Sequence, residues 1–240
     1  MHQMTQKILN FFYPNFCPKC GVFLLPEELL CDSCAEKILL EQDGYCHQCG
    51  KETCICKYQT FAYDKAVVAC RYDKETAPAV ISLKMSKNTN FAYFSARILA
   101  ERLKHGSYYQ LQNISCVMPV PMHISKQRKR GYNQAALIAK ELADLLHLPY
   151  REDVLFKERS NIAQHTLSAE ARMQNVKSFG IRDISLKYQC ILLCDDVLTT
   201  GSTMNRCAEL LKSQQASAVI AAAASSTAAK SQNLKEEKFL

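Results

Sequence analysis

The hydrophobic positions along the chain follow two periodicities. Residues 61–72 alternate enough between apolar and polar side chains to indicate strands. Residues 77–104 and 134–146 instead carry apolar side chains at helical spacing. The other predicted elements are short strands at 114–118, near 154–156, at 190–194 and at 218–222, a polar stretch over 157–177, and a helix over 202–213. Because strand and helix alternate, this part of the chain is expected to be an α/β domain with a mostly parallel sheet.

The predicted strand at 190–194 continues into the sequence CILLCDDVLTTGST, residues 190–203. A continuous apolar run is typical of a central parallel strand, because helices cover both of its faces. Ligands of open α/β sheets bind beyond the carboxyl ends of such strands, where Asp195 and Asp196 follow. Residues 199–203 then lead into a helix, whose free N–H groups attract anions. Two carboxylates beside a phosphate cradle predict a ligand with a diol and a phosphate, as in ribose 5-phosphate.

Eight of the 13 cysteines lie between residues 17 and 56. Each C-x2-C pair can wrap one side of a tetrahedral Zn²⁺ ion, and two such knuckles close a site. The simplest assignment is two structural zinc sites, formed by Cys17, Cys20, Cys31 and Cys34 and by Cys46, Cys49, Cys54 and Cys56. An interleaved pairing fits the spacing as well. Buried or redox-active thiols and iron–sulfur ligation are the alternatives to zinc.

The length of 240 residues suggests one large domain with a small module. The cysteine segment is too short for a core of its own, so bound metal would supply its folding energy. We therefore expect a zinc-ribbon-like module at 1–60 and the α/β domain at 61–240. The apolar runs are too short for a membrane-spanning helix, and the N-terminal sequence does not read as a signal peptide. The expected location is the cytoplasm, where thiols stay reduced.

Charge is distributed unevenly between these two parts. Residues 1–60 carry a net charge of −2, and residues 61–240 carry +9. A basic excess in the larger part favours polyanionic partners such as nucleotides, phosphosugars or nucleic acid. The chain contains neither G-x-x-x-x-G-K-[ST] nor G-x-G-x-x-G, which argues against a P-loop NTPase and a Rossmann dinucleotide site. Its only Gly-Lys pair, at 50–51, falls inside the cysteine segment.

A basic cluster precedes the predicted helix at 134–146. It consists of Lys126, Arg128, Lys129 and Arg130, with Tyr132 beside it. Tyr132 could stack on a base, as aromatic side chains do in proteins that bind single strands. These residues are therefore candidates for nucleic-acid contact, and Arg130 is equally a candidate for contact with phosphate. The alternative is an ordinary solvated face.

Residues 191–203 resemble the motif by which type I phosphoribosyltransferases bind 5-phosphoribosyl 1-pyrophosphate (PRPP). The whole chain resembles the ComF family of bacterial competence proteins, which join an N-terminal cysteine module to this fold. The stretches VMPVP at 117–121 and RGYNQ at 130–134 are similar to sequences characteristic of that family. Further positions that match are Lys84, Gln164, Leu167, Arg172, Asn175 and Phe179.

The resemblance implies a role for each part of the site. Asp195 and Asp196 would hold the ribose hydroxyls of PRPP, and Mg²⁺ would bridge the diol and the pyrophosphate. Arg159 and Arg172 would close over the pyrophosphate during catalysis, unless the polar stretch that carries them is a solvated loop. The remaining PRPP-binding residues would be Val197, Thr199, Thr200, Gly201, Ser202 and Thr203 around the 5-phosphate, and Val120, Pro121, Met122 and Arg130 around the pyrophosphate.

Two functions are compatible with this resemblance. In the first, the protein serves DNA uptake in natural transformation and transfers ribose 5-phosphate to an acceptor, with release of pyrophosphate through an oxocarbenium-like state. In the second, it is a non-enzymatic component of the DNA uptake machinery that senses PRPP or holds single-stranded DNA. Its partners would then include DNA-uptake proteins at the inner face of the membrane.

Overall fold

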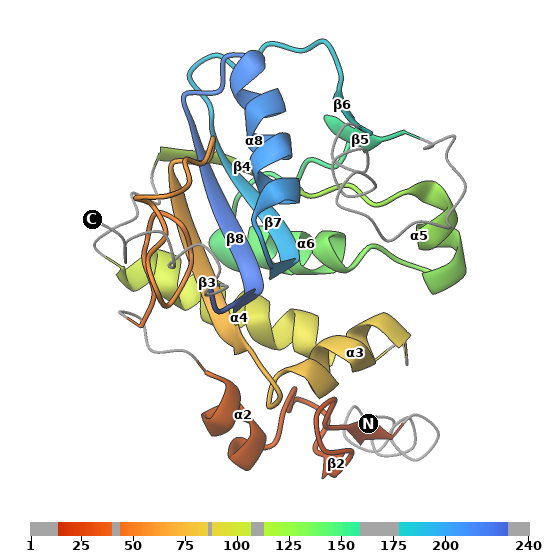
Figure 1. Ribbon diagram of the computed structural model, residues 1–240. Coiled ribbons are helices and arrows are strands. Elements are labelled where there is room, and N and C mark those ends of the chain that lie inside the picture. The colour runs from red at the N-terminus through yellow and green to blue at the C-terminus, as the bar shows by residue number, and fades with distance from the viewer. Residues whose placement is uncertain (1–13, 40–43, 86–87, 107–112, 159–177, 230–240) are drawn as a thin grey trace, which may run out of the picture.

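The chain folds around one four-stranded parallel sheet (Figure 1). The computed structural model describes residues 14–39, 44–85, 88–106, 113–158 and 178–229. The strand order is β3-β8-β7-β4, and each neighbouring pair is parallel. The four strands are β3 (Lys65–Tyr72), β4 (Ile114–Pro119), β7 (Cys190–Leu198) and β8 (Ala218–Thr227). The predicted α/β fold class is confirmed.

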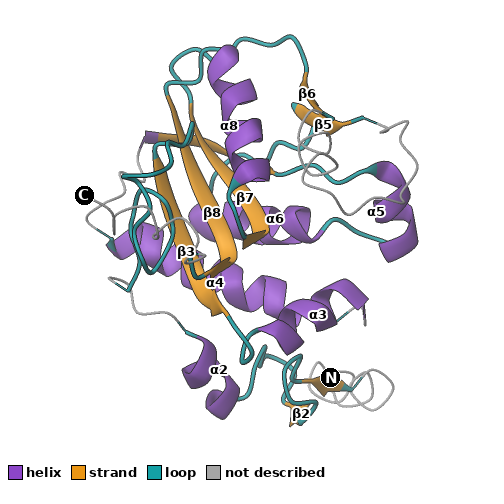
Figure 2. Ribbon diagram, viewed as in Figure 1, coloured by secondary structure: helices purple, strands orange, loops and turns teal. Residues whose placement is uncertain are grey.

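Helices cover both faces of the sheet (Figure 2). One face packs against α3 (Ala77–Met85), α4 (Asn90–His105) and α6 (Gln134–Leu146), and the other packs against α8 (Ser202–Ser213). Leu192 of β7 points into the first core and Leu193 into the second, and both are fully buried. The continuous apolar run of β7 is therefore explained by burial on both faces.

Smaller elements complete the described part of the chain. In the cysteine segment, β1 (Asn15–Phe16) pairs antiparallel with β2 (Phe23–Leu24), and α2 (Asp32–Ile38) follows. The α5 helix (Ile124–Arg130) follows β4. Strands β5 (Leu155–Lys157) and β6 (Phe179–Ile181) form an antiparallel pair. No helix in the described ranges is both long and apolar enough to span a bilayer.

Several elements differ from the prediction: β3 begins at Lys65, inside the predicted range 61–72, and α5 and β6 were not predicted. The helical sequence over 77–104 forms two helices, α3 and α4, in place of one. Strands β7 and β8 run past the predicted ends at 194 and 222 to Leu198 and Thr227. The last residues of both strands include polar side chains, so the apolar pattern did not assign them to a strand. The ladder between the strands nevertheless continues as far as Leu198 and Ser226.

The two cysteine groups lie at different places on the α/β domain (Figure 1). The first group lies near α2 and α3, and its Lys19 Nζ is 2.7 Å from Glu75 Oε2. The second group lies beside β3, where Ala66 N donates to His47 O at 2.8 Å. Each group thus contacts the α/β domain directly. The division into domains 1–60 and 61–240 stays a prediction.

Candidate functional site

The carboxyl ends of β4 and β7 bring two of the predicted segments together. Pro119 is in register with Cys194, so the turn at 120–122 lies beside Asp195. Val120 N donates to Cys194 O at 2.8 Å, and the buried Asn133 Nδ2 donates to Val120 O at 3.0 Å. These bonds fix the backbone of the turn against the end of the sheet.

A cavity of about 200 Å³ opens at this edge. Ten of the residues that line it were singled out in the sequence analysis: Asp195, Asp196, Thr203, Val120, Pro121, Met122, Lys126, Arg130, Lys84 and Phe179. The other lining residues are His123, Asn133, Gln134, Ala135 and Lys157. Four of these side chains are cationic at neutral pH and two are carboxylates. A positive excess inside one concave site favours a ligand that carries several negative charges.

The two acidic residues interact through the backbone of Asp196 and with a lysine. Asp196 N donates to Asp195 Oδ1 at 2.8 Å, and Lys84 Nζ lies 2.9 Å from Asp196 Oδ2. Burial and the neighbouring Asp196 raise the pKa of the Asp195 carboxyl well above its usual value. Two negative charges at this position are thus electrostatically unfavourable in the free protein. A ligand that donates hydrogen bonds to the carboxylates, as a diol does, would stabilise their charged form.

The loop at 199–203 follows directly and ends at the N-terminus of α8. Gly201 has a φ of +79°, and a Cβ atom there would lie 3.0 Å from Phe61 Cε1, so both backbone and space favour glycine. Ser202 N donates to Thr200 Oγ1 at 3.3 Å, and the side chains of Thr199, Thr200 and Ser202 are exposed. Exposed hydroxyls at a helix N-terminus are well suited to bind an anion.

One cation of the cavity was missed by the sequence analysis. Lys157 Nζ lies 4.1 Å from the centre of the Phe179 ring, and burial together with Lys126 lowers the pKa of its ammonium group. The sequence showed only a lysine at the start of a polar stretch, and its place in the cavity depends on the pairing of β5 with β6. The predicted residues Arg159, Gln164, Leu167, Arg172 and Asn175 lie outside the described residues.

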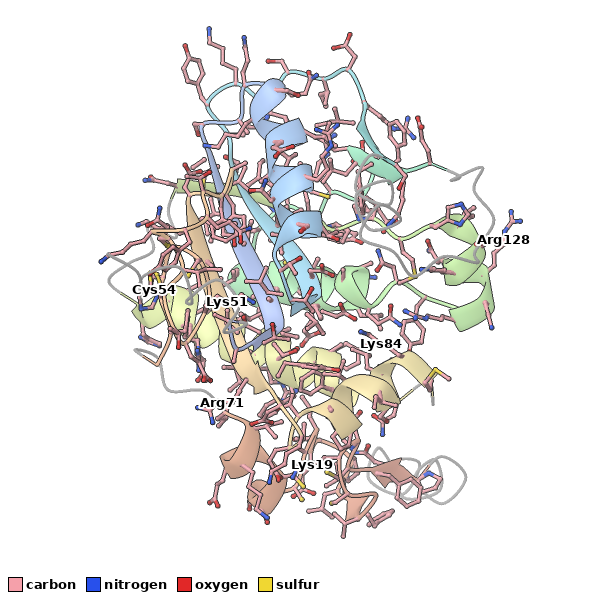
Figure 3. The ribbon with its side chains drawn as sticks, in the orientation of Figure 1. Lys19, Lys51, Cys54, Arg71, Lys84 and Arg128 are labelled. Atoms are coloured by element: carbon pink, nitrogen blue, oxygen red, sulfur yellow. The ribbon has the colours of Figure 1, made fainter. Side chains whose placement is uncertain are left out.

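The predicted basic cluster divides into two parts. Lys126 and Arg130 line the cavity, whereas Arg128 and Lys129 are exposed. Figure 3 shows Arg128 extending outward from α5. Arg130 Nη1 donates to the carboxamide oxygen of Gln134 at 3.2 Å. The half-buried Tyr132 lies between α5 and α6 and donates its hydroxyl to Leu83 O at 2.6 Å, which links this loop to α3. Contact between this cluster and nucleic acid stays a prediction.

The eight clustered cysteines form two groups of four. In each group the four sulfur atoms lie within 4.8 Å of one another, and the groups are Cys17, Cys20, Cys31 and Cys34, and Cys46, Cys49, Cys54 and Cys56. This grouping is the sequential assignment and not the interleaved one. A tetrahedral zinc with bonds of about 2.3 Å places its sulfur ligands about 3.8 Å apart. The Sγ–Sγ distances of 3.7 Å for Cys20–Cys31 and 3.8 Å for Cys46–Cys56 fit that geometry.

The backbone of both knuckles favours thiolate ligands. Burial raises the pKa of the Cys17 thiol, but backbone N–H groups of Cys31, Cys20 and Lys19 outweigh it and lower that pKa to about 7. In the second group the pKa of Cys46 is lowered to about 7 in the same way. Zinc binds the deprotonated form, so Cys17 and Cys46 are prepared for a metal ion, whereas burial and the neighbouring sulfur atoms raise the pKa of Cys34 and Cys56, whose protons the ion would displace.

Comparison with known proteins agrees with this architecture. Residues 129–239 match the family described as phosphoribosyl transferase domain. Competence protein F of Haemophilus influenzae is 30% identical over 218 residues, which cover 85% of this chain and 93% of that protein. DNA utilization protein YhgH of Escherichia coli K12 is 26% identical (85% and 81% covered), and competence protein ComFC of Bacillus subtilis is 27% identical (83% and 85% covered).

The fold, the cavity and these matches define a phosphoribosyltransferase-type α/β domain that is preceded by two four-cysteine sites. The similarity to competence protein F extends over most of both chains. The chain therefore belongs to the ComF family of competence proteins.

Proposed function

We propose that the cavity binds PRPP with Mg²⁺ and that the protein acts in DNA uptake by transferring ribose 5-phosphate to an acceptor. The observation that carries this proposal is the position of Asp195 and Asp196. They line the cavity together with four cations, and the hydroxyl-rich loop at the N-terminus of α8 follows them directly in the chain. The names of the relatives, which include competence and DNA utilization proteins, support the biological setting.

Each part of the site would have a separate task in this reaction. Asp195 and Asp196 accept hydrogen bonds from the ribose hydroxyls, and the loop at 199–203 binds the 5-phosphate. Lys84, Lys126, Arg130 and Lys157 stabilise the negative charge that grows on the departing pyrophosphate. Carboxylate oxygens are the ligand type that Mg²⁺ prefers, and the ion would supply further charge neutralisation to the pyrophosphate. The chain itself contributes mainly positioning and electrostatic stabilisation.

The proposal predicts that calorimetry in the presence of Mg²⁺ detects PRPP binding, in the roughly micromolar to millimolar range typical of enzyme substrates. A pyrophosphate-release assay across bases and amines should then identify an acceptor. If PRPP binds but no acceptor releases pyrophosphate, the transfer step is refuted and a PRPP-sensing role is favoured. The absence of any PRPP binding would refute both.

A second candidate function is supported by the exposed part of the basic cluster. Arg128 and Lys129 extend from α5 next to a cavity that already contains Lys126 and Arg130. All four cations lie on the short α5 helix and would hold single-stranded DNA by its phosphates.

This function predicts that the affinity for a single-stranded DNA oligonucleotide of arbitrary sequence falls as the salt concentration rises. Arg128→Ala with Lys129→Ala should make the slope of log affinity against log salt shallower by about 1.4, because two phosphate contacts are lost. The matched control is Lys104→Ala with Lys140→Ala, which removes two exposed lysines from α4 and α6. Equal slopes in the two variants would contradict a DNA-binding role for α5.

A further inference from the structure

Lys51 is a buried lysine that joins the second cysteine group to the end of the sheet. Its side chain is 2% exposed. Its Nζ lies 2.7 Å from Leu198 O, 3.2 Å from both Ser226 Oγ and Thr227 O, and within hydrogen-bond distance of Thr199 O. A buried ammonium group is tolerated only where its donors are satisfied. The oxygen atoms at the ends of β7 and β8 satisfy them here.

The first cysteine group shows that the knuckle itself does not require this lysine. Cys17 N donates to Val22 O at 2.8 Å, and Cys46 N donates to Lys51 O at the same distance. The two turns therefore have the same backbone pattern, with valine and lysine at equivalent positions. Val22 is 48% exposed, whereas Lys51 is buried. The reason for a lysine in the second knuckle must lie in the loop that it contacts.

The contacts of Lys51 orient the peptide groups of that loop. Lys51 holds the carbonyl oxygens of Leu198 and Thr199, and Gln59 Nε2 lies 3.4 Å from the carbonyl oxygen of Thr200. In a trans peptide the C=O of one residue and the N–H of the next point in opposite directions. The three N–H groups that follow these carbonyls therefore point away from the knuckle. Successive N–H groups with a common direction form an anion-binding concavity.

We infer that Lys51 is a positioning residue for the 5-phosphate of the ligand. It holds the carbonyl side of the loop at 199–203, so that the N–H side faces the phosphate, and it places a positive charge behind that loop. The inference rests on the proposed function, because the phosphate concerned is that of PRPP. It makes the second cysteine group a part of the sugar-phosphate site. Figure 3 shows Lys51 and Lys84 approaching this edge of the sheet from different elements.

Lys51→Met tests the inference, because methionine has a similar length but neither charge nor donors. The expected result is a roughly tenfold loss of affinity for ribose 5-phosphate, the order that one or two hydrogen bonds contribute. The affinity for magnesium pyrophosphate and the zinc content should stay unchanged. Pyrophosphate would bind among the cations at the other end of the cavity, so a variant that merely loosens the fold would lose both ligands together.

Two matched pairs of variants serve as controls. Lys19→Met removes the lysine that joins the first cysteine group to Glu75, and it should leave ribose 5-phosphate affinity unchanged. Gly50 and Gly21 have φ angles of +71° and +74°, so alanine strains both turns alike. Only at Gly50 would the new Cβ clash with Leu198, at 2.6 Å from its Cδ2. Gly50→Ala should therefore weaken ribose 5-phosphate binding more than Gly21→Ala.

The outcomes separate this inference from the function beneath it. Equal ribose 5-phosphate affinity in Lys51→Met and in the unaltered protein would overturn the inference and leave the proposed function standing. If Lys51→Met lost ribose 5-phosphate and pyrophosphate binding together, Lys51 would have only a structural role, and the inference would be overturned as well. Failure of the unaltered protein to bind ribose 5-phosphate would reject the proposed function itself.

Discussion

Asp195→Asn combined with Asp196→Asn is expected to lower the affinity for PRPP by more than about 100-fold. Each carboxylate would accept a hydrogen bond from the ribose diol, and hydrogen bonds to charged groups contribute about 1.5–3 kcal/mol. Loss of two such bonds gives at least this factor. The fold should remain intact, because asparagine preserves the size of both side chains. Calorimetry with Mg²⁺ present measures the change directly.

The same double variant should behave in the opposite way toward inorganic pyrophosphate. Removal of both negative charges leaves the four cations of the cavity unopposed and breaks the 2.9 Å ion pair between Lys84 and Asp196. Affinity for pyrophosphate without metal should therefore stay constant or rise. A variant that loses pyrophosphate and PRPP alike would indicate a damaged cavity and would contradict the assignment of the acids to the diol.

Asp195→Asn alone offers a check on stability. The pKa of Asp195 is raised in the folded protein, so its unfolded form binds fewer protons between the ordinary and the raised pKa. The carboxylate therefore costs stability at neutral pH, and this cost disappears as the pH falls toward the ordinary value near 3.8. The variant should melt at a higher temperature than the unaltered protein at pH 7, with a difference that shrinks in acid. For a chain of this size, about 1 kcal/mol corresponds to roughly 2–4 °C.

The elements that could be predicted from the sequence are those whose buried side chains recur at a regular spacing along the chain. The run at 190–194 predicted a central strand because side chains on both of its faces are apolar, and Leu192 and Leu193 indeed enter different cores. The strand boundaries could not be predicted from the same signal. The ends of β7 and β8 continue their ladders through backbone bonds, as far as Leu198 in β7 and Thr227 in β8, and polar side chains do not reveal these bonds.

The candidate site was predictable where neighbouring residues in the sequence act together. Asp195, Asp196 and the loop at 199–203 form one continuous stretch, and the parallel register alone brings the turn at 120–122 beside them. Lys157 and Lys51 could not be found in this way. Lys157 reaches the cavity through a small antiparallel pair, and Lys51 reaches the loop from a segment almost 150 positions earlier in the chain. Gly50-Lys51 looked like an isolated part of the cysteine segment, because sequence spacing says nothing about what the knuckle packs against.

Cys31→Ser is expected to cause the largest loss of stability among these variants. Serine removes one of the four thiolates of the first group. The group then binds a zinc ion far less tightly, because only three thiolates remain and the fourth coordination position is left to water. The segment around α2 owes its folding energy to that ion, so we expect destabilisation by roughly 4 kcal/mol or more. The zinc content, measured by metal analysis, should fall from about two ions per chain to about one.

Cys190→Ser provides the matched control for this change. Cys190 is buried, at 7% exposure, whereas Cys31 is half-buried, and Cys190 belongs to β7 and to neither group of four. It should keep both zinc ions and lose only the modest packing energy of a sulfur atom. Because the first group lies against α3, which carries Lys84, the Cys31→Ser protein should also bind pyrophosphate more weakly. Full zinc content in Cys31→Ser would contradict the ligand set, whereas zinc loss without destabilisation would show that the segment folds without its metal.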